Sequence, residues 1–467
     1  MKSIHDGTLR SGALHTGTLA RAQASGGTTR RKFILSVTKT VAAGSLAALD
    51  ISRFAHAASG GAIRLGLIGC GERGTGAARQ ALATGKDMKL VAMADVLDGR
   101  ITSSLSALRK AGVAADQLQV SAERRFVGFG AFQNLLVAGV DAVILSTPPG
   151  FRPLHFDAAV RAGIHSFLEK PVAVDSPGVR HVQSAAQTAR QKGLSVIVGF
   201  QEHFERSFEE FMAEIAKGAI GKINKLNAVI HMTDVPRWEP RATLEKQLGR
   251  AATEMEFQIR NWYPFVWLSG DMIVELLVHH INTCLWAKGI QPQSARGAAE
   301  RREHTGSDYG NISDFCSVTY RYADGTELSA EISGLSGATK TYQTSIEGEK
   351  GIAIAPNKIV DRRGRLIWTY SGPKKDPYQE EMNQWCASIR NGKPLNTVSS
   401  AADSTLLAIM GRTAAYTDNE ITWDEIQRST ETFFPGNPKS FQTLPPDLPD
   451  KFGDYQFPSQ GLLTGAA

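Results

Sequence analysis

The chain has 467 residues, of which 42% are hydrophobic, so it can hold two packed domains and is too apolar for a disordered protein. Its formal charge of +6 arises within residues 1–57, which carry eight Lys or Arg and two acidic residues. The remainder carries 44 residues of each sign, and this balance argues against a basic surface for nucleic acid.

Residues 1–57 have the order of segments that is typical of an export signal. Arg30 and Arg31 precede a mildly apolar stretch, and the sequence AHA at 55–57 provides a small-residue cleavage site. This order predicts a twin-arginine signal peptide and a periplasmic or otherwise exported protein. Charged residues interrupt the apolar stretch, so neither a membrane span nor a stable membrane anchor is expected. A basic first helix of the folded domain is the alternative.

Residues 62–200 alternate short apolar strands with helical segments. The strands are expected at 63–69, 89–95, 124–128, 141–147, 165–170 and 195–200, and helices at 74–84, 97–111, 153–162 and 175–192. Because the strands are apolar on both faces, this pattern predicts an α/β domain with a parallel, doubly wound sheet.

Residues 201–434 have a different texture, with helical segments at 205–217 and 271–287 between longer β-like runs. Asp324-Gly325 lies between two alternating strands and marks a hairpin. These features predict an α+β domain with an open, mostly antiparallel sheet. Residues 435–467 are rich in proline and are expected to form an extended tail.

An apolar strand runs into a helix through the glycine-rich turn Gly69-x-Gly71-x-x-Gly74. The first glycine permits the bend, the second lets the backbone approach a pyrophosphate, and the third lets the helix pack closely. Asp95 ends the next strand, where its carboxylate would bind both ribose hydroxyls and repel a 2′-phosphate, so NAD is favoured over NADP. Arg73 within the turn could tolerate that phosphate. A turn that only connects strand and helix is the alternative.

The carboxyl ends of two later strands supply further candidate cofactor contacts. Ser146, Thr147 and Pro148 follow the fourth strand, at the edge where such sheets bind their ligand. Glu169 and Lys170 end the fifth strand at the same edge. A lysine beside a nicotinamide could hydrogen-bond a substrate hydroxyl and help to move its proton, whereas the alternative is a solvated side chain.

The predicted helix at 271–287 carries a polar stripe on an otherwise apolar surface. Asp271, Glu275, His279 and Asn282 fall within about 80° of one another at 100° per residue. Burying such groups is costly, so the stripe favours His279 as a general base oriented by Glu275. His280 points about 100° away and is the weaker candidate. A satisfied polar seam between the two domains is the alternative.

No metal site is predicted. Glu275 and His279 are spaced so that they could share a cation, but no second cluster completes the coordination. The cysteines have no C-x-x-C spacing and are expected to be buried singly, at Cys70, Cys284, Cys316 and Cys386.

Together these motifs make residues 62–430 resemble the glucose–fructose oxidoreductase, inositol dehydrogenase and rhizopine-catabolism family. The resemblance implies an N-terminal Rossmann domain for NAD or NADP and a C-terminal α+β domain whose open sheet often forms homo-oligomers. Lys170 matches the lysine of the family's Glu-Lys-Pro motif, and His279 matches the histidine that serves the redox step. Glu275 stands where the family more often has Asp, and Asn282 replaces a frequent Asp, departures that resemble an exported branch.

The segment before this helix is rich in aromatic and amide side chains that suit sugar faces and hydroxyls. Packing beneath a loop is the alternative for its rings. The candidate substrate residues are Arg260, Asn261, Trp262 and Tyr263 in this segment, Gln201 and His203 after the sixth strand, and Asp271 and His280 on the helix.

The predicted function is an NAD(P)-dependent oxidoreductase that acts on a carbinol of a sugar, glycoside or cyclitol. Export of a folded chain favours a tightly bound cofactor, because free NAD is expected to be scarce outside the cytoplasm. A family alternative is an NAD-dependent glycoside hydrolase that works by transient oxidation, elimination and water addition. A non-catalytic protein that binds nucleotide or glycan is a minor alternative.

Overall fold

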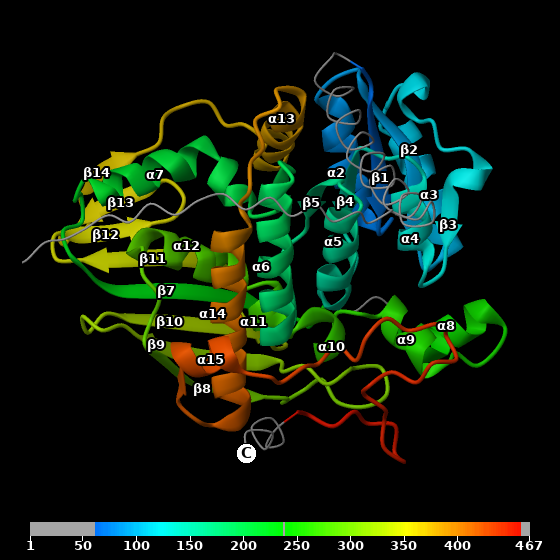
Figure 1. Ribbon diagram of the computed structural model, residues 1–467. Helices are drawn as coiled ribbons and strands as arrows, with labels where there is room; N and C mark the ends of the chain where they lie inside the picture. Colours follow the sequence, from blue (N-terminus) through cyan, green and yellow to red (C-terminus); the bar gives the residue numbers. More distant parts are fainter. Residues whose placement is uncertain (1–60, 237–238, 459–467) are drawn as a thin grey trace, which may run out of the picture. The chain divides into compact units, whose positions relative to one another are not determined.

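The computed structural model describes residues 61–236 and 239–458 (Figure 1). The predicted signal peptide and the last residues of the predicted tail, 459–467, lie outside the described residues. The described part contains two sheets, one parallel and one mostly antiparallel, which confirms the predicted fold class.

The first sheet has six parallel strands in the order β3-β2-β1-β4-β5-β6. Strands β2 and β3 are added on one side of β1 and the next three on the other, so the strand order reverses between β1 and β4. Its central strands are buried from end to end, as expected where helices cover both faces. The strands are β1 (Ile63–Ile68), β2 (Met88–Asp95), β3 (Arg125–Val127), β4 (Ala142–Leu145), β5 (His165–Leu168) and β6 (Val196–Val198).

Helices cover both faces of this sheet. Alternate strand residues pack into two cores, one shared with α2 and α3 and the other with α4, α5 and α6. Asp175 caps α6 by accepting a hydrogen bond from the Gly178 amide at 2.8 Å. The helices are α2 (Glu72–Ala83), α3 (Asp98–Lys110), α4 (Ala131–Val137), α5 (Arg152–Arg161) and α6 (Ser176–Gln191).

A segment from late in the chain completes the first sheet's core. Helix α13 (Pro377–Arg390) packs on α2, and its Met382, Trp385 and Cys386 side chains are fully buried in the core beneath β1 and β2. A few residues later, Asn396 forms a parallel bridge with Val196 at the edge of the sheet. The nucleotide-binding half therefore draws its cover from both ends of the chain.

The second sheet has nine strands in the order β14-β13-β12-β11-β7-β10-β9-β8-β15, and β7 and β10 are its parallel pair. Burial alternates along β9 and β11, because one face packs on helices and the other is more open. The strands are β7 (Ile223–Met232), β8 (Ser294–Glu300), β9 (Phe315–Arg321), β10 (Glu327–Gly334), β11 (Thr341–Gly348), β12 (Gly351–Ile354), β13 (Lys358–Asp361), β14 (Leu366–Thr369) and β15 (Ile421–Thr422).

Helix α14 is buried along most of its length and contacts α6 on one side and α12, β8 and β9 on the other (Figure 1). It therefore joins the two halves of the described chain. The helices of this part are α7 (Arg206–Ala216), α8 (Arg241–Leu248), α9 (Glu254–Arg260), α10 (Val266–Ser269), α11 (Met272–Glu275), α12 (Val278–Lys288), α14 (Val398–Thr417) and α15 (Trp423–Arg428).

The prediction of one continuous helix over 271–287 is wrong. The structure has α11, a break at Leu276 and Leu277, and then α12. At the break the Leu277 amide donates to the carbonyl of Met272, and the His279 amide donates to Leu276 rather than to Glu275. The first bond spans five residues and the second spans three, so the regular α-helical pattern is interrupted here and the Glu275 carbonyl is left free for another donor.

Residues 429–458 form an extended segment that we name the C-terminal strap. It contains no helix or longer strand, and its one bridge joins Pro449 to Tyr455. Its Tyr455 side chain is completely buried.

All four cysteines are free thiols in the core.

Candidate active site

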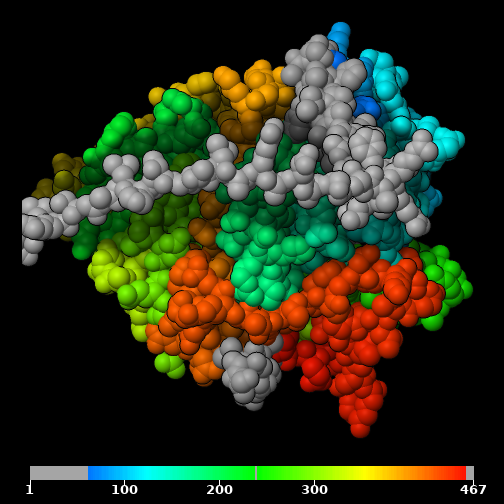
Figure 2. All heavy atoms as spheres, in the orientation of Figure 1, coloured from blue at the N-terminus to red at the C-terminus, as the bar shows by residue number. Residues whose placement is uncertain are grey.

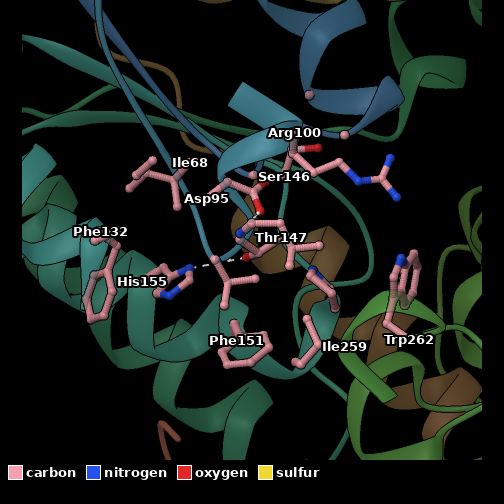
Figure 3. Close-up of a pocket in the computed structure, with 18 of the residues that line it drawn as sticks. Ile68, Asp95, Arg100, Phe132, Ser146, Thr147, Phe151, His155, Ile259 and Trp262 are labelled. Atoms are coloured by element: carbon pink, nitrogen blue, oxygen red, sulfur yellow. Dashed lines mark hydrogen bonds between the residues drawn. The ribbon is translucent and has the colours of Figure 1, made fainter. Parts of the chain in front are cut away.

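A cavity of about 310 Å³ opens at the carboxyl ends of β1, β2 and β4 (Figure 3). This is the edge at which open parallel sheets bind nucleotides, at the point where strand order reverses. The predicted residues that line the cavity are Gly69, Gly71, Arg73, Gly74, Asp95, Ser146, Thr147 and Pro148 from the first domain and Arg260 and Trp262 from the second half. The remaining predicted cofactor contacts, Glu169 and Lys170, do not line it.

The three glycines of the turn occupy different environments. Gly69 has φ of +91°, and a Cβ there would lie 2.6 Å from the Ser146 carbonyl oxygen. A Cβ on Gly74 would lie 2.0 Å from the Gly69 carbonyl oxygen, so the helix packs too closely for any side chain. A Cβ on Gly71 would meet nothing within 4 Å. The second glycine thus borders open space into which a pyrophosphate fits.

Asp95 is held at the rim of the cavity by the backbone. Its carboxylate accepts hydrogen bonds from the Cys70 amide at 2.7 Å and the Leu97 amide at 2.9 Å. Burial raises the pKa of Asp95, although these two bonds act in the opposite direction. The carboxylate therefore has a fixed orientation at the place where ribose hydroxyls would need an acceptor.

Arg73 lines the cavity, but its guanidinium is already paired. It forms an ion pair with Glu169 and approaches the Glu381 carboxylate of α13 at 3.6 Å. Burial, together with the nearby Glu169 carboxylate, raises the pKa of Glu381 well above its ordinary value. Glu169 thus lies behind the glycine turn as a partner of Arg73. We therefore correct the expectation that Arg73 is available to a 2′-phosphate.

Lys170 lies at the end of β5, on the other side of the reversal point from β1. Its ammonium donates to the backbone carbonyl of Glu275 at 2.6 Å and to the Glu275 carboxylate at 2.9 Å. The carbonyl is the one that the break between α11 and α12 leaves free. The lysine and the helix break therefore form one unit, and both side chains of the pair are mostly buried.

His279 is paired with Glu202, a residue that the sequence analysis did not select. The His279 Nδ1 atom lies 2.9 Å from a Glu202 carboxylate oxygen. Burial alone would raise the pKa of Glu202, but the contact with His279 outweighs it and lowers that pKa. The prediction that Glu275 orients His279 is wrong, because Glu275 is engaged by Lys170.

The other predicted residues after β6 support this pair. Gln201 donates to the Glu202 carboxylate at 3.0 Å. His203 stacks on Trp286 at 4.2 Å between ring centres and contacts the Asn282 side chain at 2.9 Å. Burial lowers the pKa of His203, so it is a neutral partner within the packing.

Asp271 and His280 are held in the second half of the chain. The buried Asp271 carboxylate accepts from the Ser313 amide and hydroxyl at 2.8 Å and from Tyr416. The His280 ring contacts the Thr344 hydroxyl on β11 at 2.7 Å, and burial lowers its pKa to about 4. We therefore correct the expectation that these two residues contact substrate.

The aromatic segment before α10 is divided between two places. Arg260 and Trp262 line the nucleotide cavity. The Asn261 side chain is buried and accepts a hydrogen bond from the Glu239 amide at 2.8 Å. Tyr263 is buried, and its pKa is raised by burial and by the Glu275 carboxylate. Of the four predicted substrate residues in this segment, Tyr263 is therefore the one placed beside the Lys170–Glu275 pair.

Residues 61–236 and 239–458 contain no group of three or more metal-ligating side chains. In the same ranges, no helix has the length and apolar character needed to cross a membrane.

Comparisons with known proteins agree with this geometry. Residues 63–200 match the family described as the Gfo/Idh/MocA oxidoreductase family with an NAD-binding Rossmann fold. An inositol 2-dehydrogenase of Acidothermus cellulolyticus is 24% identical over 347 residues, which cover 71% of this chain and 86% of that protein. A myo-inositol dehydrogenase of Streptomyces leeuwenhoekii is 28% identical over 144 residues, but this match spans 42% of that protein.

Solved structures show the same fold. The scyllo-inositol dehydrogenase of Lactobacillus casei with bound NAD(H) and scyllo-inositol superposes with a TM-score of 0.55 at 19% identity, covering 77% of this chain and 99% of that chain. An aldose–aldose oxidoreductase of Caulobacter crescentus gives a TM-score of 0.59 at 14% identity, with the same two shares covered. The predicted NAD-binding fold is confirmed: residues 63–200 form a Rossmann domain that matches the Gfo/Idh/MocA oxidoreductase family.

Proposed function

We propose that this protein is an NAD-dependent dehydrogenase that oxidises a ring carbinol of a cyclitol or a related sugar. The observation that carries the proposal is the pairing of Lys170 with Glu275 and of His279 with Glu202. Both pairs belong to the β5 and β6 side of the first sheet, next to the nucleotide cavity at β1, β2 and β4. This placement provides a base and a hydrogen-bond donor where the reactive half of the dinucleotide is expected.

The residues have separable roles. An ammonium has three N–H donors, and Glu275 accepts two of them, so Lys170 keeps one for a substrate oxygen. His279 would take the hydroxyl proton through Nε2, because Nδ1 faces Glu202. The Glu202 carboxylate would offset the positive charge that forms on the imidazole. Bound NAD would supply the hydride acceptor.

A substrate panel tests this proposal. The purified protein is supplied with NAD and with myo-inositol, scyllo-inositol, free aldoses and aryl glycosides in D₂O, and products are followed by proton NMR. A ketone that accumulates with any glycosidic bond intact supports the dehydrogenase. Turnover should fall by at least about 100-fold in Lys170→Met and His279→Asn, the usual range for loss of general acid–base groups. Unchanged turnover in both variants would refute the mechanism.

The alternative function is glycoside hydrolysis by a transient oxidation. In that cycle a ketone acidifies the neighbouring C–H, the aglycone leaves by elimination, water adds, and the ketone is reduced again. Arg260 and Trp262 support this alternative, because they line the nucleotide cavity from the second half of the chain and a retained cofactor suits a cycle without net redox change. Aglycone release with deuterium beside the oxidised carbon would establish it, and silence across the panel would favour a binding role.

Three further features belong to the proposal: a tightly bound cofactor, export through the twin-arginine route and assembly into homo-oligomers through the second sheet. The pair Arg30 and Arg31 supports the export route. Replacing both arginines by lysine should leave the protein in the cytoplasm, as fractionation would show.

The open face of the nine-stranded sheet supports the assembly into homo-oligomers, and light scattering of the purified protein would measure the mass of the assembly.

A further inference from the structure

The nucleotide cavity has an outer wall that does not come from the Rossmann domain. Ile259 and Arg260 at the end of α9, Trp262 just beyond it, and Asn437 of the C-terminal strap line the cavity opposite the strand ends. Figure 3 shows Ile259 and Trp262 on the side of the cavity away from Phe132 and Ile68. Since the strap and α9 are far apart in sequence, the wall exists only when both are in place.

One end of the strap is fixed to the Rossmann domain. The Arg180 guanidinium donates to the backbone carbonyls of Gln427 at 2.7 Å and Ser429 at 2.9 Å. The buried Asp175 carboxylate accepts from the Phe433 amide at 2.8 Å and from the Thr432 hydroxyl at 3.0 Å. The strap therefore leaves α6 in a defined direction.

The middle of the strap closes on the cavity. The Asn437 side-chain amide donates to the carbonyl of Phe129, itself a lining residue, at 3.1 Å. Phe441 packs edge-to-face on Phe129 at 5.4 Å, and Phe434 does the same on Phe151 at 5.1 Å. Aromatic contacts of this kind hold the strap against the cavity lining.

The last part of the strap holds α9 in place. The Thr253 hydroxyl donates to the strap carbonyl of Phe441 at 2.7 Å, and the Gln258 side chain donates to that of Asp447 at 2.6 Å. The Tyr455 hydroxyl donates to the Glu254 carboxylate at 2.6 Å. Figure 2 shows the orange and red C-terminal segment along the lower part of this face, beside the green atoms of the α8 and α9 region.

The chemistry of the cavity identifies the part of the dinucleotide that this wall covers. The cavity lies at the carboxyl ends of β1, β2 and β4, with Asp95 at its rim and the rings of Phe129, Phe132 and Phe151 in its lining. A planar base fits against apolar and aromatic side chains, and a ribose diol fits a fixed carboxylate. The lining does not include Lys170 or His279, where the reactive half would lie.

We propose that α9 and the C-terminal strap form the outer wall of the adenosine half-site, and that this wall must open before the dinucleotide leaves. Resting on the proposed function, this names the device that retains the cofactor between turnovers. Trp262 is then an adenine contact rather than a substrate contact. Release becomes slow because several strap bonds must break together, while the reactive half remains accessible to substrate.

The test measures the rate at which NADH leaves the full-length protein. Protein loaded with NADH is mixed with a large excess of NAD⁺, and the decay of bound NADH fluorescence gives the release rate. Tyr455→Phe removes the hydroxyl that reaches Glu254, and Asn437→Ala removes the bond to Phe129. Leu444→Ser is the matched control, since Leu444 is on the strap but 72% exposed.

We expect release to be at least about tenfold faster in the Tyr455→Phe/Asn437→Ala double variant, roughly the effect of losing one to two net hydrogen bonds. The Leu444→Ser variant should match the wild type. Equal release rates in all three proteins would overturn the inference while leaving the dehydrogenase intact. A wild-type protein that binds no NADH would instead refute the proposed function.

Hydrogen exchange provides a second readout that does not depend on the variants folding well. Binding of NADH to the wild-type protein should slow amide exchange in α9 and in residues 433–441 of the strap. Exchange in residues 443–453, further from the cavity, should change much less. Protection that is absent from α9 and from residues 433–441 would contradict the assignment of the wall.

Discussion

Replacing Glu202 with glutamine tests the least expected part of the site. The change keeps the shape of the side chain but removes its charge beside His279. At 2.9 Å and an effective dielectric constant of 20, the attraction between the carboxylate and a protonated imidazole is about 6 kcal/mol before desolvation costs. If the transition state for proton transfer to His279 uses about half of this attraction, the variant's activation barrier rises by about 3 kcal/mol. Such a rise lowers kcat roughly 100-fold.

The assay is initial-rate NADH formation with the substrate that the panel identifies, measured across pH 5 to 10. The Glu202→Gln variant should lose kcat with little change in the affinity for NAD, because Glu202 does not line the nucleotide cavity. Glu209→Gln is the control, because Glu209 is a half-exposed residue of α7 that pairs with Arg206 and does not contact His279. A kcat within twofold of wild type would refute the role of the pair.

Four other substitutions probe the turn, the lysine and acid stability. Gly74→Ala should lower both the affinity for NAD and the melting temperature, because its Cβ would lie 2.0 Å from the Gly69 carbonyl oxygen. Gly71→Ala should lower the affinity for NAD alone, since its Cβ would meet nothing within 4 Å. Calorimetric titration with NAD and thermal melting curves separate the two effects. Lys170→Met should reduce kcat by about 100-fold with NAD affinity within a few-fold, and an equal loss of both would contradict its placement on the reactive side. Asp314→Asn should lower the free energy of unfolding by about 1–2 kcal/mol at pH 7. The reason is that hydrogen bonds to the Asp314 carboxylate hold its pKa at about 2, against an ordinary 3.8. That stabilisation is complete above about pH 4 and is lost as the pH falls towards 2, so urea unfolding at pH 7 and pH 3 should show a shrinking difference.

The parallel sheet was predictable because its strands are short apolar runs that end at glycine or at charged residues. The nucleotide edge followed from Gly69, Gly71 and Gly74, whose spacing has a steric reason that the structure displays. Helices α13 and α14 were not predicted. Helix α14 is buried on nearly all sides, so it lacks the polar face whose period identifies an amphipathic helix.

The candidate site was predictable only in part. Lys170 was identified because it ends a buried strand, and that information is local. The pairing of His279 with Glu202 joins residues 77 positions apart, and no spacing pattern indicates it. The stripe on 271–287 was misinterpreted for a related reason: at the break in the helix the Glu275 carbonyl accepts a hydrogen bond from Lys170, a contact across 105 positions. Arg260 and Trp262 had the composition of a ligand loop, but their place in the nucleotide cavity, beside Asn437 of the strap, depends on the tertiary fold.

The position of α13 beneath β1 and β2 has a consequence for the newly made protein. A ribosome that has released residues 62–200 has produced every strand of the first sheet, yet the core of that sheet still lacks Met382, Trp385 and Cys386. At that stage the edge strand β6 also lacks its bridge to Asn396. Vectorial folding from the N-terminus therefore stalls at a half-covered sheet, and the nucleotide site matures only when synthesis is nearly finished. Cofactor capture becomes one of the last steps in the folding of the newly made chain.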